Sequence, residues 1–159
     1  MAQRLLLVFV VAGIDQAQKL TMILGFGWQG GERVEVTSFF DYVLVWNTGI
    51  SFSLFNSFPA WGLSAIMAIL SFIVLTWMFK AHTKWLIVAL ALIAGGALGN
   101  LFDRLVHGAV ADFFFFHAFG FEWFVFNLAD VAITVGIIMW IWDSFFGSGA
   151  QENKENQAT

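Results

Sequence analysis

The chain has 159 residues, of which 60% are hydrophobic and only 11% charged, and its mean hydropathy is +0.81. A soluble domain carries about 25% charged residues, so this composition excludes an ordinary soluble protein and indicates an integral membrane protein with one small helical bundle. The net charge of −4, with no Lys or Arg cluster, argues against a nucleic-acid partner, and the lack of cysteine excludes a disulfide framework, a thiol nucleophile and a thiolate metal site.

Four apolar segments are long enough to cross a membrane, which takes about 20 helical residues. They run over residues 5–24, 59–79, 85–105 and 124–146. The second begins at Pro59, a residue favoured in the first turn of a helix. A secretory signal peptide is the alternative for the first segment because Arg4 precedes its apolar core, but Asp15 and Lys19 are unusual neighbours of a cleavage site. We therefore expect a mainly α four-transmembrane-helix bundle, with one domain over residues 1–147.

The distribution of Lys and Arg in the short connections predicts the orientation of the bundle. One side carries Arg4, Lys80, Lys84 and Lys154. The other side carries Arg33 and Arg104 among five acidic residues, namely Glu32, Glu35, Asp41, Asp112 and Glu122. We expect both termini to be cytoplasmic and two regions to lie on the outer side.

The first outer region, residues 25–58, has the pattern of short strands. Residues 33–37 alternate polar and apolar side chains, as a half-buried strand does. Residues 42–46 are β-branched or aromatic except for Leu44, and Asn47 with Gly49 then supplies turn chemistry. The sequence predicts a small extracytoplasmic β-element of two to four strands, lying on the outer membrane face.

The second outer region, residues 106–123, is shorter and very rich in phenylalanine. We expect it to be a loop whose Phe113 to Phe116 run, with Phe119, rests in the membrane interface. The tail over residues 148–159 is polar and is predicted to be disordered.

Polar side chains recur at helical spacing in three of the four spans. Residues three, four and seven apart share a helix face. The sets are Asp15 and Lys19 in the first span, Asn100, Asp103, Arg104 and His107 in the third, and Asn127, Asp130 and Thr134 in the fourth. At 1.5 Å rise per residue, the stripes begin ~16 to ~24 Å from the inner ends of their helices. All three therefore fall in the outer half of the membrane, where we expect them to face one shared pocket.

Taken singly, these features have ordinary structural explanations. Asp15 and Lys19 can be a structural ion pair within one helix, and Asp103 and Arg104 can anchor a helix end at the membrane interface. Asn47 can be a turn residue, and the G-x-x-x-G spacing of Gly95 and Gly99 is typical of a close-packing helix face. The coincidence of three stripes at one depth favours a functional site, because ionisable groups inside a membrane are costly. The histidines are too isolated to predict a metal site.

Asp112, arriving from the second outer region, and Asp130 are the pair that we select for chemistry. Two carboxylates a few ångströms apart cannot both ionise easily, so they share a proton and titrate as a unit. One can then activate water as a general base while the other donates a proton to the carbonyl oxygen or to the leaving amine. The sequence has only three histidines and no P-loop or H-E-x-x-H motif, so no competing catalytic arrangement is indicated.

In these residues the chain resembles lipoprotein signal peptidase, or signal peptidase II, a family of bacterial membrane aspartyl proteases. The resemblance covers most of the chain in five ordered blocks. They are Asp15-x-x-x-Lys19, Asn47-Thr48-Gly49 with Phe52, Gly99-Asn100-x-x-Asp103-Arg104, Val110-x-Asp112-Phe113, and Phe126-Asn127-x-Ala129-Asp130. Ile50-Ser51 departs from the two alanines that many members carry after the glycine.

The resemblance implies an aspartic endopeptidase that removes the signal peptide of diacylglyceryl-modified prolipoproteins, cutting before the lipidated cysteine. It matches Asp112 and Asp130 to the catalytic dyad. The supporting or substrate-binding residues that it implies are Asn47, Asn100, Arg104, Asn127, Asp15, Lys19, Gly49, Asp103 and Ala129. It also implies a β-cradle over the membrane, a monomer in the bacterial cytoplasmic (inner) membrane whose active site lies near the periplasmic face, and inhibition by globomycin. No cofactor or metal is expected.

Two other classes of function remain open from the sequence. A proton-coupled carrier or channel subunit would also place Asp and Lys inside the membrane, although four spans without two similar halves make a poor transporter. A non-catalytic interaction protein with a polar assembly interface is the second alternative.

Overall fold

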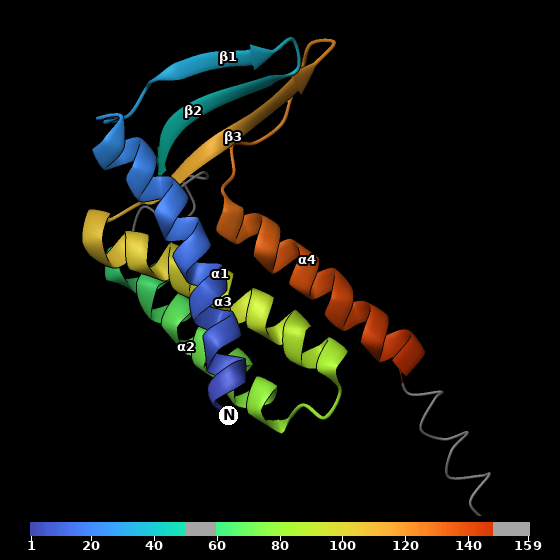
Figure 1. Cartoon of the computed structure of the whole chain (residues 1–159). Helices are drawn as coiled ribbons and strands as arrows, with labels where there is room; N and C mark the ends of the chain where they lie inside the picture. Colours follow the sequence, from blue (N-terminus) through green and yellow to red (C-terminus); the bar gives the residue numbers. More distant parts are fainter. Residues whose placement is uncertain (50–59, 148–159) are drawn as a thin grey trace, which may run out of the picture.

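The computed structural model describes residues 1–49 and 60–147. Within these ranges four helices are long and apolar enough to cross a membrane. They are α1 (Ala2–Leu20, continued by the π-turn η1, Thr21–Gly25), α2 (Ala60–Lys80), α3 (Lys84–His107) and α4 (Leu128–Trp142, continued by η3, Asp143–Gly147). The prediction of a mainly α, four-span bundle is confirmed. The start of α1 and the end of α4 both lie away from the β-sheet, which sits at the other end of the helices (Figure 1).

Helix α3 lies at the centre of the bundle and packs against α1, α2 and α4. Its small residues allow this close approach, since Ala89, Ala91 and Ala94 are at most 1% exposed. A Cβ atom placed on Gly95 would lie 2.6 Å from Val11 Cβ in α1, and one on Gly96 would lie 2.5 Å from the Ala129 carbonyl oxygen in α4. The glycines of α3 therefore form a packing face, as their spacing predicts.

The ends of α3 are defined by local side-chain and backbone signals. Thr83 caps the N-terminus, where its Oγ1 accepts a hydrogen bond of 3.1 Å from the Leu86 N–H. Gly108 ends the helix in the left-handed region at φ 73°. These caps lengthen the predicted span of 85–105 slightly at both ends.

A four-stranded antiparallel sheet covers one end of the bundle. Its strands are β1 (Arg33–Thr37), β2 (Phe40–Asn47), β3 (Val110–Ala118) and β4 (Phe121–Glu122), in the spatial order β1-β2-β3-β4. The two strands predicted in the first outer region are confirmed. The other two strands, β3 and β4, come from the second outer region, and β3 lies beside β2 (Figure 1).

The expectation that residues 106–123 form a loop is therefore wrong. Aromatic residues favour a pleated, half-buried surface, and residues 114–116 of the phenylalanine run pair with residues 40–42 of β2. Phe40 stacks on Phe116 with ring centroids 4.8 Å apart, and Tyr42 contacts Phe113 and Phe114. This pairing places Asp112 opposite Val45.

Helix α4 begins at Leu128, four residues after the predicted start at 124. Phe126 instead forms a bridge to Phe114, with backbone hydrogen bonds of 2.8 and 3.2 Å. Asn127 is extended, at φ −130° and ψ 179°, and caps the helix. Pairing with the sheet and capping of the helix therefore keep residues 126 and 127 out of α4. As a result, Asp130 lies in the first turn of α4.

A charged cluster that the sequence analysis did not find joins β1, β2 and β3. Asp41 is 1% exposed, and its Oδ2 lies 2.5 Å from both Nε and Nη2 of Arg33. Its Oδ1 lies 3.2 Å from His117 Nε2. Burial acts to raise the pKa of Asp41, but the hydrogen bonds from His117 and Arg33 outweigh it and hold the pKa below its usual value. The cluster depends on strand register, which the sequence pattern does not specify.

Some predictions fall outside the described residues. They are the start of the second span at Pro59, the contacts of Ile50, Ser51 and Phe52, and the disordered tail over 148–159. The single domain over residues 1–147 likewise stays a prediction.

Candidate active site

Asp112 on β3 and Asp130 on α4 are linked through two asparagine side chains. Asn127 Nδ2 donates to Asp112 Oδ1 at 2.7 Å and to Asn100 Oδ1 at 3.1 Å. Asn100 Nδ2 in turn donates to Asp130 Oδ1 at 2.8 Å. Residues far apart in the sequence thus converge on one hydrogen-bonded set that contains both candidate carboxylates.

The start of α4 fixes the position of Asp130. Asn127 Oδ1 accepts from the Asp130 N–H at 2.9 Å, and Asp130 Oδ2 accepts from the Asn127 N–H at 3.2 Å, which completes a reciprocal capping box. At this end of a helix the aligned peptide dipoles interact favourably with a negative side chain. The sequence of the cap therefore also sets the orientation of the carboxylate.

Asp112 lies in a more enclosed environment than its partner. It is 2% exposed, and Asn47 Nδ2 donates to its Oδ2 at 3.0 Å. Burial raises the pKa of Asp112 to about 6 and the nearby charge of Asp130 adds to this effect, although hydrogen bonds from Asn47 and Asn127 favour the ionised form. Asp112 therefore keeps its proton up to a higher pH than an ordinary aspartate does.

The turn after β2 brings the third-span arginine to the same place. Gly49 adopts φ 77°, and its N–H donates to Asn47 Oδ1 at 2.8 Å. Arg104 Nη1 donates to the Thr48 carbonyl at 3.2 Å, and a Cβ on Gly49 would lie 2.9 Å from Arg104 Nη2. Glycine is needed here both for the left-handed backbone and for the close approach of the guanidinium group.

Lys19 connects the first-span stripe to the third-span stripe. Its Nζ lies 2.8 Å from Asp15 Oδ2, 2.7 Å from Asp103 Oδ2 and 3.2 Å from Asn100 Oδ1. The side chains of Lys19 and Asp15 are each 1% exposed, and that of Asp103 is 3% exposed. The Asp15–Lys19 pair is thus part of a buried layer between helices, and Asn100 joins that layer to the two carboxylates.

The two aspartates of this layer also hold backbone groups next to the candidate dyad. Asp15 Oδ1 accepts from the Ala129 N–H at 2.9 Å, so α1 fixes the first turn of α4. Asp103 Oδ2 accepts from the Ala111 N–H at 3.1 Å, so α3 fixes the strand immediately before Asp112. The structure therefore brings together all the site residues that the sequence analysis selected.

Gln16 is a member of this layer that the sequence analysis missed. Its Nε2 donates to Asp103 Oδ1 at 2.8 Å, to the Gly99 carbonyl at 3.1 Å and to Asp15 Oδ2 at 3.3 Å. Its position three residues before Lys19 was the available signal, because that spacing places both residues on one helix face.

A cleft of about 290 Å³ opens beside Asp112. It is lined by the end of β2 and the turn after it, together with Phe124 and Val125 from the segment before α4. Asn47 and Gly49 lie in its wall. A polypeptide entering this cleft would meet the buried carboxylate together with amide donors. The arrangement suits general acid–base attack of water on a peptide carbonyl.

Comparison with known proteins agrees with this geometry. The sequence profile described as signal peptidase (SPase) II matches residues 7–146. A lipoprotein signal peptidase of Rhodopseudomonas palustris strain TIE-1 is 43% identical over 148 residues, covering 89% of this chain and 90% of that protein. One from Beijerinckia indica is 42% identical over 140 residues, covering 86% and 84%.

Two solved structures, each described as a bacterial membrane enzyme, have the same fold. One is 26% identical, with a TM-score of 0.69 over 95% of this chain and 92% of its own. The other is 28% identical, with a TM-score of 0.69 over 89% and 91%. With the four spans and the sheet, these matches identify a multi-pass membrane protein with peptidase relatives over nearly its whole length. The chain belongs to the signal peptidase II family.

Proposed function

We propose that this protein is an aspartic endopeptidase that removes the signal peptide from diacylglyceryl-modified prolipoproteins, cutting before the lipidated cysteine. Its relatives are named lipoprotein signal peptidases, which supports this class of substrate. The observation that carries the aspartic mechanism is the linkage of Asp112 to Asp130 through Asn127 and Asn100, beside a cleft.

In the proposed reaction Asp130 acts as the general base and Asp112 as the general acid. Asp130 takes a proton from water, and the water oxygen bonds to the scissile carbonyl carbon while Asp112 gives its proton to the carbonyl oxygen. Collapse of the tetrahedral intermediate breaks the C–N bond: the proton on Asp130 passes to the leaving amine, and Asp112 takes back a proton from a hydroxyl of the intermediate, which restores the dyad. The raised pKa of Asp112 supports its role as the acid, because carboxylates in different environments divide these roles.

The remaining polar residues are proposed to position the substrate or the dyad. Asn47 lines the cleft, and Arg104 donates to the Thr48 carbonyl in its wall, which supports a role for their remaining N–H groups in holding substrate carbonyl oxygens. Lys19 and Asp15 act through Asn100 and Ala129 and are positioning residues.

The location of the site fits a substrate that is itself a membrane helix. The scissile bond of a lipidated signal peptide lies near the membrane surface. Asp112 is near the start of β3 and Asp130 is in the first turn of α4, and these ends of the two elements lie where the helices meet the sheet (Figure 1). We propose that this end faces the periplasm from the inner membrane, with both termini cytoplasmic. The Lys and Arg distribution supports that orientation.

Mass spectrometry of reaction products tests the proposed substrate. The purified full chain is incubated with a prolipoprotein peptide that carries the diacylglyceryl group on its cysteine, and in parallel with the unmodified peptide. We expect one cut, immediately before the cysteine, in the modified peptide alone. A cut at another bond, or equal cleavage of both peptides, would contradict the proposed specificity.

A further inference from the structure

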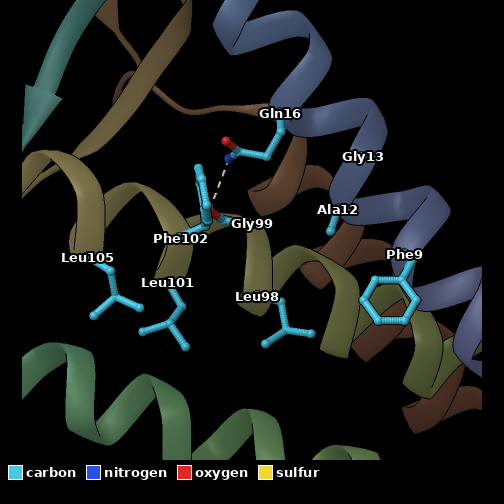
Figure 2. Close-up of a pocket in the computed structure, with 9 residues that line it drawn as sticks. All are labelled: Phe9, Ala12, Gly13, Gln16, Leu98, Gly99, Leu101, Phe102 and Leu105. Atoms are coloured by element: carbon cyan, nitrogen blue, oxygen red, sulfur yellow. Dashed lines mark hydrogen bonds between the residues drawn. The ribbon is translucent and has the colours of Figure 1, made fainter.

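A second hollow, on the membrane-spanning part of the bundle, is separate from the cleft. It lies between α1 and α3, is lined by side chains between Phe9 and Gln16 and between Leu98 and Leu105, and has a volume of about 430 Å³. Figure 2 shows these side chains, among which Gln16 supplies the polar group and donates to the Gly99 carbonyl. We refer to this hollow as the α1–α3 groove.

Small residues of α1 leave the groove open. A Cβ atom placed on Gly13 would meet nothing within 4 Å, and Ala12 offers only a methyl group. The rim is formed by Phe9, Phe102 and Leu105, which are 65%, 49% and 70% exposed. These residues belong to helices that are long and apolar enough to span a membrane, so the groove opens toward lipid hydrocarbon.

The buried polar layer separates the groove from the cleft. Asp15, Lys19 and Asp103 are at most 3% exposed, and Gln16 contacts Asp103 from the groove side. The described residues that line the groove include none that line the cleft beside Asp112. A substrate acyl chain that stays in the cleft with the scissile bond therefore contacts none of the residues that line the groove.

We propose that the α1–α3 groove binds one acyl chain of a bilayer phospholipid. The length of α1 between Phe9 and Gln16 is ~10 Å, about two thirds of the ~15 Å hydrocarbon depth of one leaflet. Gln16 lies near the end of α1 that continues through η1 toward β1, so the polar side chain of the lining is on the side where the headgroup of an outer-leaflet lipid would lie. The bound chain covers the hydrogen bond of Gln16 to the Gly99 carbonyl, which is dashed in Figure 2, and its hydrogen bond to Asp103. It thereby keeps water from the buried layer.

Photo-crosslinking tests the site in the full chain. The probe is phosphatidylglycerol with a diazirine in its acyl chain, used in nanodiscs of phosphatidylethanolamine and phosphatidylglycerol, and the labelled peptides are mapped by mass spectrometry. We expect groove peptides to be labelled several-fold more than the exposed Ile69 and Phe72 of α2. Gly13→Leu fills the groove and should lose most of that labelling, whereas Ala68→Leu, on the exposed face of α2, should keep it.

Three results would overturn the proposal. Equal labelling of the groove and of α2 would show that the groove is ordinary lipid-facing surface. Unchanged groove labelling in Gly13→Leu, or in Ala12→Leu if the first variant does not fold, would show that no chain lies between the helices. Displacement of the probe by the diacylglyceryl-modified peptide would assign the groove to substrate lipid. None of these readouts depends on peptidase activity, so the proposed function is tested separately.

Discussion

Asp112 and Asp130 carry the same functional group in two different settings. Asp112 is buried on a strand between Asn47 and Asn127, whereas Asp130 belongs to the capping box at the start of α4. Different surroundings allow two carboxylates to divide the roles of acid and base. The proton that Asp112 holds is therefore the feature that should control how activity depends on pH.

The pH dependence of kcat/KM tests this role. Asp112 has a raised pKa of about 6 and must be protonated to donate, so activity should fall as the pH rises through about 6. Asn47→Ala removes a hydrogen bond that favours the ionised form, so it should raise the pKa further and move this alkaline limb to higher pH. Glu122→Gln, an exposed carboxylate on β4, is the control and should leave the limb unchanged. A limb that moves to lower pH in Asn47→Ala would contradict the assignment.

Lys19 is the cation of the buried layer, and its loss should destabilise the fold. Lys19→Met would leave Asp15 and Asp103 without their charged partner, and breaking a buried ion pair costs about 3–5 kcal/mol. Equilibrium unfolding in mixed detergent micelles measures the effect. Lys80→Met, at the exposed end of α2, is the matched control and should change the free energy of unfolding by less than about 0.5 kcal/mol. Equal effects of the two substitutions would show that the layer contributes nothing specific.

At the scale of elements, α3 positions the site because its small residues let α1 and α4 approach closely. Gly96 lies against α4 at Ala129, and Gly99 lies against Asp15 of α1, which in turn binds the Ala129 N–H. Close packing of these helices is thus coupled to the orientation of the first turn of α4. That turn carries Asp130.

Gly96→Val tests the link between packing and the site. A Cβ at this position would lie 2.5 Å from the Ala129 carbonyl oxygen, so the substitution must push α4 away and should cost about 1–3 kcal/mol of stability. Activity should fall with it, since Asp130 moves with the helix. Gly13→Ala, whose Cβ meets nothing within 4 Å, is the control and should be neutral or slightly stabilising in thermal unfolding. Full stability in Gly96→Val would contradict the packing observed here.

Individual elements show what the sequence could and could not predict. The spans and their polar stripes were predictable because burial in a membrane imposes length and helical periodicity on the sequence. Strand β3 was not, because its run of phenylalanines fits both an interfacial loop and a paired strand, and only pairing with β2 decides between them. The cluster of Arg33, Asp41 and His117 depends on that same register.

For the molecule as a whole, the buried charged residues gather where the helices meet the sheet. Among the described residues the buried ionisable groups are Asp15, Lys19, Asp41, Asp103 and Asp112, on the sheet itself or in the adjoining ends of α1 and α3. A proton-coupled carrier needs polar groups along a path through the membrane. The buried ionisable groups in the described part of this protein are instead confined to the sheet end of the bundle. That distribution favours chemistry at a membrane surface, in agreement with membership of a peptidase family.

Cleavage of a diacylglyceryl-modified prolipoprotein by single carboxylate variants tests the central claim most directly. Asp112→Asn and Asp130→Asn each keep the shape of the side chain but cannot exchange the catalytic proton. Each should lower kcat by at least about 100-fold, with helical content and thermal unfolding close to wild type. Asp143→Asn, at the opposite end of α4, should cleave at the wild-type rate. Near-wild-type cleavage by a folded Asp112→Asn or Asp130→Asn protein would contradict the claim that these two carboxylates perform the hydrolysis.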